Sequence, residues 1–172
     1  MPILIRRLEQ NDGLKTFDCG DHRLNDYLKR HAWANQQQNL VGVTYVAADQ
    51  SHPKLVIGYY TLATSSIPRH ALPGELTKDL PRYQNLPVAL LARLAVDLRF
   101  QGSGLGKELL RHALENVLSL SKQIGCRYLI VDAYPTAVKW YEKYGFMPIG
   151  ETSPGGTQPM FLDVRTLELA LQ

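Results

Sequence analysis

The spacing of hydrophobic residues predicts a chain that alternates between strands and helices. Short runs rich in β-branched and aromatic residues predict strands at residues 2–8, 41–48, 55–67, 88–97, 126–134, 146–150 and 160–164. Hydrophobic residues three or four positions apart predict helices at residues 21–37, 104–124 and 135–144. Residues 68–87 contain four prolines and predict a loop with at most a short helix.

The order of these elements indicates the fold class. Residues 41–67 form a predicted hairpin, whose strands are antiparallel, and residues 88–134 form a strand–helix–strand unit, whose strands run parallel. We therefore expect an α+β (mixed α/β) fold, with a central, mostly antiparallel sheet that contains one parallel pair and is flanked by helices. No repeat or linker divides the chain, so residues 1–172 are expected to form a single domain.

Composition narrows the class of protein. Hydrophobic residues make up 45% and charged residues 20% of the chain, as in ordinary soluble globular proteins. The chain has no run of 18 apolar residues and no signal-peptide pattern, so we expect neither a membrane span nor export. Cys19 and Cys126 lie far apart without metal-type spacing. We therefore expect neither a disulfide nor a zinc site, and we expect the protein to lie in the cytoplasm.

The strongest chemical signal is the stretch L-A-V-D-L-R-F-Q-G-S-G-L-G-K at residues 94–107. A strand, a glycine-rich turn and a helix in this order direct free backbone N–H groups and a helix N-terminus at an anion. Residues 69–127 also carry nine Lys or Arg against five Asp or Glu, although the whole chain has a net charge of only +3. This excess suits a polyanionic ligand, while charge alone favours an ordinary solvated surface.

Two common phosphate-binding motifs do not fit this turn. A P-loop requires G-x-x-x-x-G-K-[ST], but Glu108 follows Lys107 and Gln101 stands at the first glycine position. A dinucleotide fold requires G-x-G-x-x-G, whereas the spacing here is G-x-G-x-G. A third pattern fits better: R-x-x-G-x-G, from Arg99 to Gly104, resembles the acetyl-CoA loop [RQ]-x-x-G-x-[GA] of the GNAT acetyltransferase superfamily.

Further segments extend the resemblance. W-Y-E-K-Y-G-F at residues 140–146 is similar to the tyrosine region of GNAT enzymes. F-D-C-G and L-N-D-Y-L near the N-terminus, with A-R-L-A-V-D-L-R-F-Q-G-S-G-L-G, resemble the acetyltransferase toxins of bacterial toxin–antitoxin pairs. That family implies transfer of an acetyl group from acetyl-CoA to the α-amino group of aminoacyl-tRNA, which inhibits translation. It also implies a ribbon-helix-helix antitoxin that binds operator DNA, and a homodimer.

The resemblance implies roles for particular residues. Tyr141 would act as the general acid that protonates the departing thiolate; without the resemblance, Tyr141 and Tyr144 read as core aromatics. Backbone groups of the strand would bind the pantetheine and those of the turn the pyrophosphate, with Arg99 or Lys107 assisting. The expected acetyl-CoA contacts are Leu94, Ala95, Val96, Arg99, Gln101, Gly102, Ser103, Gly104, Leu105, Gly106 and Lys107.

The acceptor is indicated by a missing carboxylate. Between Pro87 and Phe100 the only acid is Asp97, whereas many lysine acetyltransferases of the superfamily place a glutamate on this strand. A lysine amine, with a pKa of about 10.4, must be deprotonated by a base before it can attack. An α-amine, with a pKa of about 8, is already substantially uncharged near neutral pH and depends less on such a base. Arg93 and Arg82 are candidate contacts to RNA phosphate, and an ion pair across the sheet is the alternative for Arg93.

Two other functions stay open from the sequence. The chain could acetylate a protein N-terminus or a small amine, or it could be a non-catalytic module that binds acetyl-CoA or an antitoxin. A drug or polyamine pocket is typically acidic, which the basic middle of this chain disfavours. The sequence does not indicate which aminoacyl-tRNA is modified or which surface forms a dimer.

Overall fold

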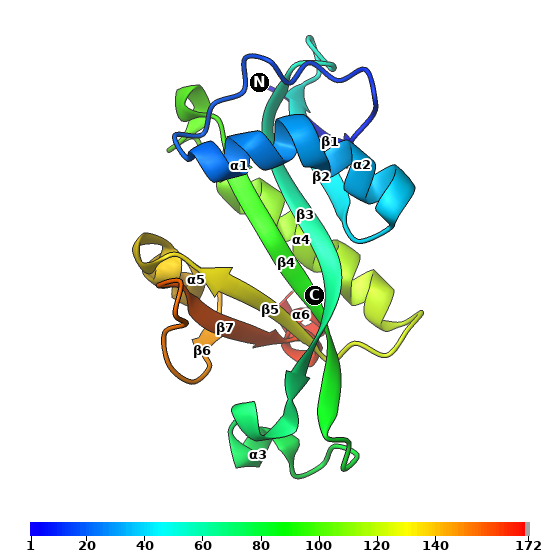
Figure 1. Ribbon diagram of the computed structural model, residues 1–172, viewed down its shortest axis with the longest axis vertical. Helices are drawn as coiled ribbons and strands as arrows, with labels where there is room; N and C mark the ends of the chain where they lie inside the picture. Colours follow the sequence, from blue (N-terminus) through cyan, green and yellow to red (C-terminus); the bar gives the residue numbers. More distant parts are fainter. Residues whose placement is uncertain (171–172) are drawn as a thin grey trace. The chain divides into compact units, whose positions relative to one another are not determined.

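The computed structural model describes residues 1–170, which form a mixed α/β fold (Figure 1). Over these residues, seven strands lie in one sheet in the order β1-β2-β3-β4-β5-β7-β6. The sheet is mostly antiparallel with one parallel pair, and helices flank it. The predicted fold class is therefore confirmed.

The elements have the following bounds. The strands are β1 (Ile3–Arg7), β2 (Val43–Asp49), β3 (Val56–Pro68), β4 (Asn85–Val96), β5 (Tyr128–Ala133), β6 (Met147–Pro148) and β7 (Gln158–Asp163). The α-helices are α1 (His22–Asp26), α2 (Ala32–Ala34), α3 (Gly74–Thr77), α4 (Leu105–Ser121), α5 (Val138–Lys143) and α6 (Val164–Ala170). Two π-helical turns are η1 (Tyr27–His31) and η2 (Asn35–Asn39), and three 3-10 turns are η3 (Arg69–Ala71), η4 (Leu98–Phe100) and η5 (Pro135–Ala137).

The fold groups into two compact units, and each is built from two separate stretches of chain. The first unit contains residues 1–63 and 91–115, and the second contains residues 64–90 and the chain from residue 116 onward. Strands β3 and β4 each contribute residues to both units. No helix in the described part of the chain is long and apolar enough to cross a membrane.

The core of the first unit is organised around Tyr59 of β3. Its ring lies edge-on to Phe17, with centroids 5.7 Å apart, and stacks on Tyr27 at 6.4 Å. Its hydroxyl donates a hydrogen bond of 2.8 Å to the carbonyl of Leu24. Because aromatic pairs add to the stability gained from burial, Tyr59 fixes the N-terminal helical segment on this face of the strands.

The N-terminal helical segment was predicted as one helix over residues 21–37, but it alternates between α and π turns. The side chain of Asp21 caps it by accepting a hydrogen bond from the Arg23 backbone N–H. Near its end, Gln36 is buried, donates to the Leu8 carbonyl and accepts from the Thr44 N–H, both at 3.0 Å. These bonds fix a polar side chain inward, which a count of hydrophobic spacings does not reveal.

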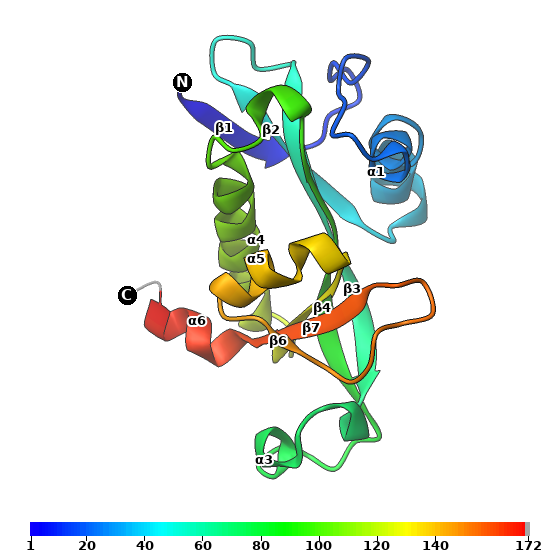
Figure 2. The same cartoon turned by 90° about the vertical axis from the view of Figure 1, so that its left-hand side faces the viewer.

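Helix α4 covers the opposite face of the first unit's strands, as Figure 2 shows. A Cβ added to Gly58 of β3 would lie 3.0 Å from Leu109 and 3.3 Å from Leu105, so the strand packs closely on the helix. On the same face, the Tyr60 hydroxyl lies 2.7 Å from Nδ1 of His112. Helices therefore enclose the strands of this unit on both faces, as expected.

His112 makes the stability of the fold sensitive to pH. Burial lowers the pKa of His112, whereas the unfolded chain has the ordinary value of about 6.5. Protonation therefore favours the unfolded state, and the stabilisation present above about pH 6.5 is lost as pH falls through the folded pKa. We expect the free energy of unfolding in urea to fall between pH 7.5 and 5.5, and to fall less in His112→Gln. Equal slopes for the two proteins would contradict this role of His112.

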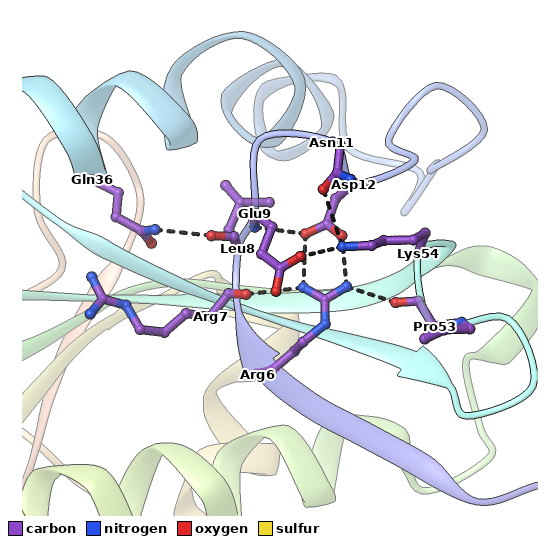
Figure 3. Close-up of polar contacts among 9 residues, drawn as sticks. All are labelled: Arg6, Arg7, Leu8, Glu9, Asn11, Asp12, Gln36, Pro53 and Lys54. Atoms are coloured by element: carbon purple, nitrogen blue, oxygen red, sulfur yellow. Dashed lines mark hydrogen bonds and ion pairs between the residues drawn. The ribbon is translucent and has the colours of Figure 1, made fainter.

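A charged network fastens the first strand to its neighbours in the first unit (Figure 3). Arg6 of β1 donates to both carboxylate oxygens of Asp12, at 2.6 and 3.0 Å, and to the Pro53 carbonyl at 2.7 Å. Lys54 pairs with Glu9 and donates to the Asn11 side chain. Because the Asp12 side chain is fully buried, its pair with Arg6 is held more firmly than an exposed ion pair.

The second unit departs most from the predicted boundaries. Strand β5 pairs with β7, and β7 pairs with β6, but the strand expected at residues 146–150 is only two residues long. Helix α6 was not predicted. In the expected loop at residues 68–87, η3 and α3 form, and the Arg69 guanidinium donates to the carbonyls of Thr77, Leu80 and Pro81. This cation therefore holds the arm between β3 and β4 together.

Candidate active site

The glycine-rich turn lies between β4 and α4, as the sequence predicted. Gly102 has φ +78° and Gly104 has φ +89°, a conformation that residues with a side chain rarely adopt. A Cβ at either position would meet nothing within 4 Å. Backbone conformation, rather than lack of space, therefore requires glycine at these two positions.

Helix α4 begins at Leu105, directly after the turn. Leu105 is buried and anchors the helix start, whereas Gly102, Ser103, Gly104 and Lys107 are exposed. The first N–H groups of a helix have no partner within it, and the helix dipole adds positive charge there. The arrangement suits a phosphate group, in line with the predicted contacts at residues 101–107.

Strand β4 supplies the other predicted acetyl-CoA contacts. Ala95 and Val96 are buried and Leu94 is partly buried, so their side chains belong to the packing of the first unit. Contacts from their backbone groups to a pantetheine stay a prediction. The side chains and the backbone of this strand can serve different roles because they point in different directions.

Asp97 follows the strand and forms a bidentate ion pair with Arg99. Arg99 Nε lies 2.8 Å from one carboxylate oxygen and Nη2 lies 3.0 Å from the other. Hydrogen bonds from Arg99 are the main cause that lowers the pKa of Asp97 to about 2. Such a carboxylate is a poor proton acceptor near neutral pH, so the only acid in this stretch of strand and turn does not supply the missing base.

Gln101 is a part of the turn whose structural role the sequence reading missed. Its side-chain amide donates to the carbonyls of Val96, at 2.9 Å, and Cys19, at 3.0 Å. The pattern [RQ]-x-x-G-x-[GA] also fits a second frame, from Gln101 through Gly104 to Gly106. That overlap was visible in the sequence, and in this second frame the helix begins between the two glycines.

Tyr141, the predicted general acid, lies on α5 in the second unit. Its ring packs edge-on against Trp140 at 5.0 Å and Phe146 at 5.3 Å, and burial raises the pKa of its phenol. No buried side-chain nitrogen or oxygen among the described residues lacks a hydrogen-bond partner. The Tyr141 hydroxyl has no partner within residues 1–170, so it must be reached by solvent.

The two predicted RNA contacts lie in different units. Arg93, in the first unit, places its guanidinium carbon 3.5 Å from the centre of the Tyr27 ring, and it forms no ion pair with a carboxylate within residues 1–170. The alternative of an ion pair across the sheet is therefore wrong. Arg82, in the second unit, lines a pocket of about 650 Å³ with His70 and the exposed Tyr83.

The described residues contain no cluster of three or more His, Cys, Asp or Glu side chains that could hold a metal ion. Cys19 and Cys126 are both free thiols. Burial raises the pKa of each thiol, so both stay protonated at neutral pH.

Comparison with known proteins gives consistent results. The family model for the acetyltransferase (GNAT) domain matches residues 30–148. A "tRNA-acetylating toxin" from Mycobacterium tuberculosis is 34% identical over 163 residues, which cover 94% of each chain. The structure of AtaT complexed with acetyl-methionyl-tRNAfMet is 31% identical, with a TM-score of 0.88 over 99% of this chain and 100% of that one.

A second solved structure contains a mutant of the toxin AtaT bound to the C-terminus of the antitoxin AtaR and acetyl-CoA. It is 27% identical, with a TM-score of 0.80 over 99% of this chain and 98% of that one. The agreement extends over nearly the full length of each protein, and it includes the strand, turn and helix described above. The chain therefore belongs to the GNAT family of acetyltransferases.

Proposed function

We propose that this acetyltransferase moves an acetyl group from acetyl-CoA to the α-amino group of an aminoacyl-tRNA, and so inhibits translation as the toxin of a toxin–antitoxin pair. The observation that carries the proposal is the similarity, over 94% of both chains, to a tRNA-acetylating toxin. The glycine turn before α4 and the solvent-reached Tyr141 hydroxyl supply chemistry suited to it. We also propose that residues 1–172 act as one acetyltransferase domain.

Acetyl-CoA would be held mainly by backbone groups. The N–H groups of residues 101–107 and the start of α4 would receive the pyrophosphate, because glycines there allow close approach. The exposed Lys107 adds positive charge beside the helix start. Backbone groups of β4 at Leu94, Ala95 and Val96 would bind the amides of the pantetheine arm, as strands pair with extended ligands.

The reaction exchanges one bond for another. The lone pair of the α-amine attacks the acetyl carbonyl carbon, a C–N bond forms, and the C–S bond of the thioester breaks. The departing thiolate of coenzyme A takes a proton from the Tyr141 hydroxyl, the amine loses a proton to water, and the Tyr141 phenolate then regains a proton from solvent. Because burial raises the pKa of Tyr141, the phenol stays protonated and serves as a donor at neutral pH.

The choice of an α-amine follows from the state of Asp97. Its carboxylate is occupied by Arg99 and the Asp18 N–H, so it is not free to deprotonate a substrate. An α-amine with a pKa of about 8 is substantially uncharged near neutral pH, while a lysine amine is not. This favours the aminoacyl end of a charged tRNA over a lysine side chain.

RNA would be bound by dispersed positive charge. Arg93 has no carboxylate partner within the described residues and stacks on Tyr27, which leaves its charge for a phosphate. Arg82, His70 and the exposed Tyr83 line the pocket on the β3–β4 arm, where an unpaired base can stack and a phosphate can bind. Binding of this kind weakens as salt concentration rises.

Several partners follow from the proposed function. A cognate antitoxin would neutralise the enzyme, as in the solved complex of AtaT with the C-terminus of AtaR. We propose that the antitoxin is a ribbon-helix-helix protein that carries the complex to operator DNA, which makes the pair a repressor. We further propose a homodimer that acts in the cytoplasm.

The test uses the purified full-length chain with acetyl-CoA and a mixture of charged bacterial tRNAs. We expect acetylated aminoacyl-tRNA, detected by mass spectrometry after RNase digestion, and arrest of growth when the chain is induced without an antitoxin. Uncharged tRNA is the control, because it lacks the α-amine and should not be acetylated.

Other results would identify the alternatives. Acetylation of peptides or small amines, with charged tRNA left unmodified, would show that the acceptor is one of these amines and not aminoacyl-tRNA. Binding of acetyl-CoA without turnover on any amine would indicate a non-catalytic module. The similarity to tRNA-acetylating toxins over nearly the whole chain favours neither alternative.

A further inference from the structure

We propose that Asp97 is a positioning residue that holds the glycine turn in the geometry needed to bind acetyl-CoA. It does so through a clamp formed with Asp18, Cys19, Arg99 and Gln101, which we call the Asp97 clamp. The inference rests on the proposed function, since it concerns the same acetyl-CoA turn. It gives the N-terminal segment F-D-C-G, at residues 17–20, a role in the cofactor site.

The Asp97 carboxylate is the centre of the clamp. Its side chain is 2% exposed and accepts four hydrogen bonds, three from Arg99 and one from the backbone N–H of Asp18, at 2.8 to 3.1 Å. Ionised acceptors make hydrogen bonds roughly twice as strong as neutral ones. The carboxylate therefore fixes the start of the turn and the N-terminal segment at the same time.

Two more bonds join the same segments. The N–H of Leu98 donates to the Asp18 carbonyl at 2.8 Å, and the side-chain amide of Gln101 donates to the Cys19 carbonyl at 3.0 Å. With the bond from the Asp18 N–H to Asp97, three hydrogen bonds tie residues 97–101 to residues 18–19. These bonds end directly before Gly102, where the left-handed conformations begin.

Strand β3 supports the turn from its other side. The pairing of β2 with β3 shifts by one residue at Ala47 and Ala48, which leaves Ile57 as a β-bulge. The Ile57 carbonyl accepts a hydrogen bond of 2.9 Å from the Asp97 N–H. Bulges occur preferentially next to active sites, where they redirect a group out of the regular ladder. Asp97 is thus fixed through both its backbone and its side chain.

The N-terminal segment is itself fixed by burial and hydrogen bonds, which the clamp requires. Phe17 is fully buried, and the Asn25 side chain accepts from the Cys19 N–H and donates to the Asp18 carboxylate, both at 2.9 Å. Gly20 has φ +87°, and a Cβ there would lie 3.3 Å from the Leu98 side chain. The segment therefore transmits the position of α1 to the turn.

The experiment compares Asp97→Asn with Asp163→Asn in the full-length protein. Asp163 is a matched control because it forms a similar bidentate pair, with Arg127, but lies in the second unit. Isothermal titration gives the Kd for acetyl-CoA, steady-state kinetics give kcat at saturating acetyl-CoA, and thermal melting reports folding. Both variants are expected to melt at lower temperature than the parent.

For Asp97→Asn we expect the Kd for acetyl-CoA to rise about tenfold, because a displaced turn presents its N–H groups poorly. The kcat at saturation should change less than about twofold, since Asp97 does not touch the reacting atoms. Asp163→Asn should keep the parent's Kd. An unchanged Kd for a folded Asp97→Asn would overturn the clamp and leave the proposed function intact, whereas a parent that does not bind acetyl-CoA would overturn the proposed function.

If Asp97→Asn does not fold, Asn25→Ala decides the question. This variant removes the bonds that hold Asp18 and Cys19 without altering the turn itself. We expect a severalfold rise in the Kd for acetyl-CoA with kcat unchanged. A Kd equal to that of the parent would show that the clamp contributes only to stability, and would overturn the proposal.

Discussion

Replacing Tyr141 with phenylalanine is expected to lower kcat for acetyl transfer by about 10²- to 10⁴-fold, the usual range for loss of a positioned general acid. The substitution removes one oxygen and leaves the ring, which packs edge-on against Trp140 and Phe146. The hydroxyl has no partner within the described residues, so its loss breaks no internal hydrogen bond. Folding and the Kd for acetyl-CoA should therefore match those of the parent.

The measurement follows release of free coenzyme A with a thiol reagent, with charged tRNA as the acceptor. Tyr144→Phe is the matched control, because Tyr144 also packs against Trp140, at 5.0 Å, and was assigned to the core. That variant should keep kcat within about twofold of the parent. A Tyr141→Phe enzyme as fast as the parent would refute the assignment of the general acid.

Replacing Gly104 with valine is expected to raise the Kd for acetyl-CoA by about 100-fold. Gly104 has φ +89°, and a β-branched residue held in this region is strained by about 3 kcal/mol. Since a Cβ would meet nothing within 4 Å, the strain is relieved by changing the backbone angle, which turns the N–H groups of the turn away from the pyrophosphate. The same amount of free energy corresponds to about 100-fold in affinity.

Gly125→Val is the control for this substitution. Gly125 lies beyond the other end of α4, has no positive φ, and also has open space around its Cβ position. Its replacement should leave the Kd for acetyl-CoA within about twofold of the parent. Equal affinities for the Gly104 and Gly125 variants, measured by titration calorimetry, would show that the pyrophosphate does not depend on this turn.

The spacing of hydrophobic residues was sufficient to predict the longer elements of the fold. The apolar periodicity identified α4 and the long strands, because their side chains face the core at regular intervals. It missed α6, since Val164 was assigned to the end of the preceding strand. It placed a strand at residues 146–150 but made it too long, because the two residues of β6 are too short a run to define its ends.

The candidate site was predictable where its residues lie in one short stretch of sequence or in a motif of the resembling family. Spacing alone indicated an anion-binding turn at residues 94–107, and the resemblance added Tyr141 as the acid. The hydrogen bond between Asp18 and Asp97 was not predictable, because Asp18 lies 79 residues away in the chain and no local pattern reports so distant a contact. Arg93 was left between two roles for the same reason: its neighbour Tyr27 lies on a separate helical segment.

The interleaved composition of the two units has a consequence for how the chain is made. Residues 91–115 complete the first unit, yet they are synthesised after residues 64–90 of the second. A ribosome-bound chain that stops before residue 91 lacks the turn, Asp97 and Leu98, so the hydrogen bonds between the N-terminal segment and the turn cannot form. Because contacts between distant segments form slowly, acetyl-CoA binding should arise late in biosynthesis, only after two-thirds of the polypeptide has left the exit tunnel.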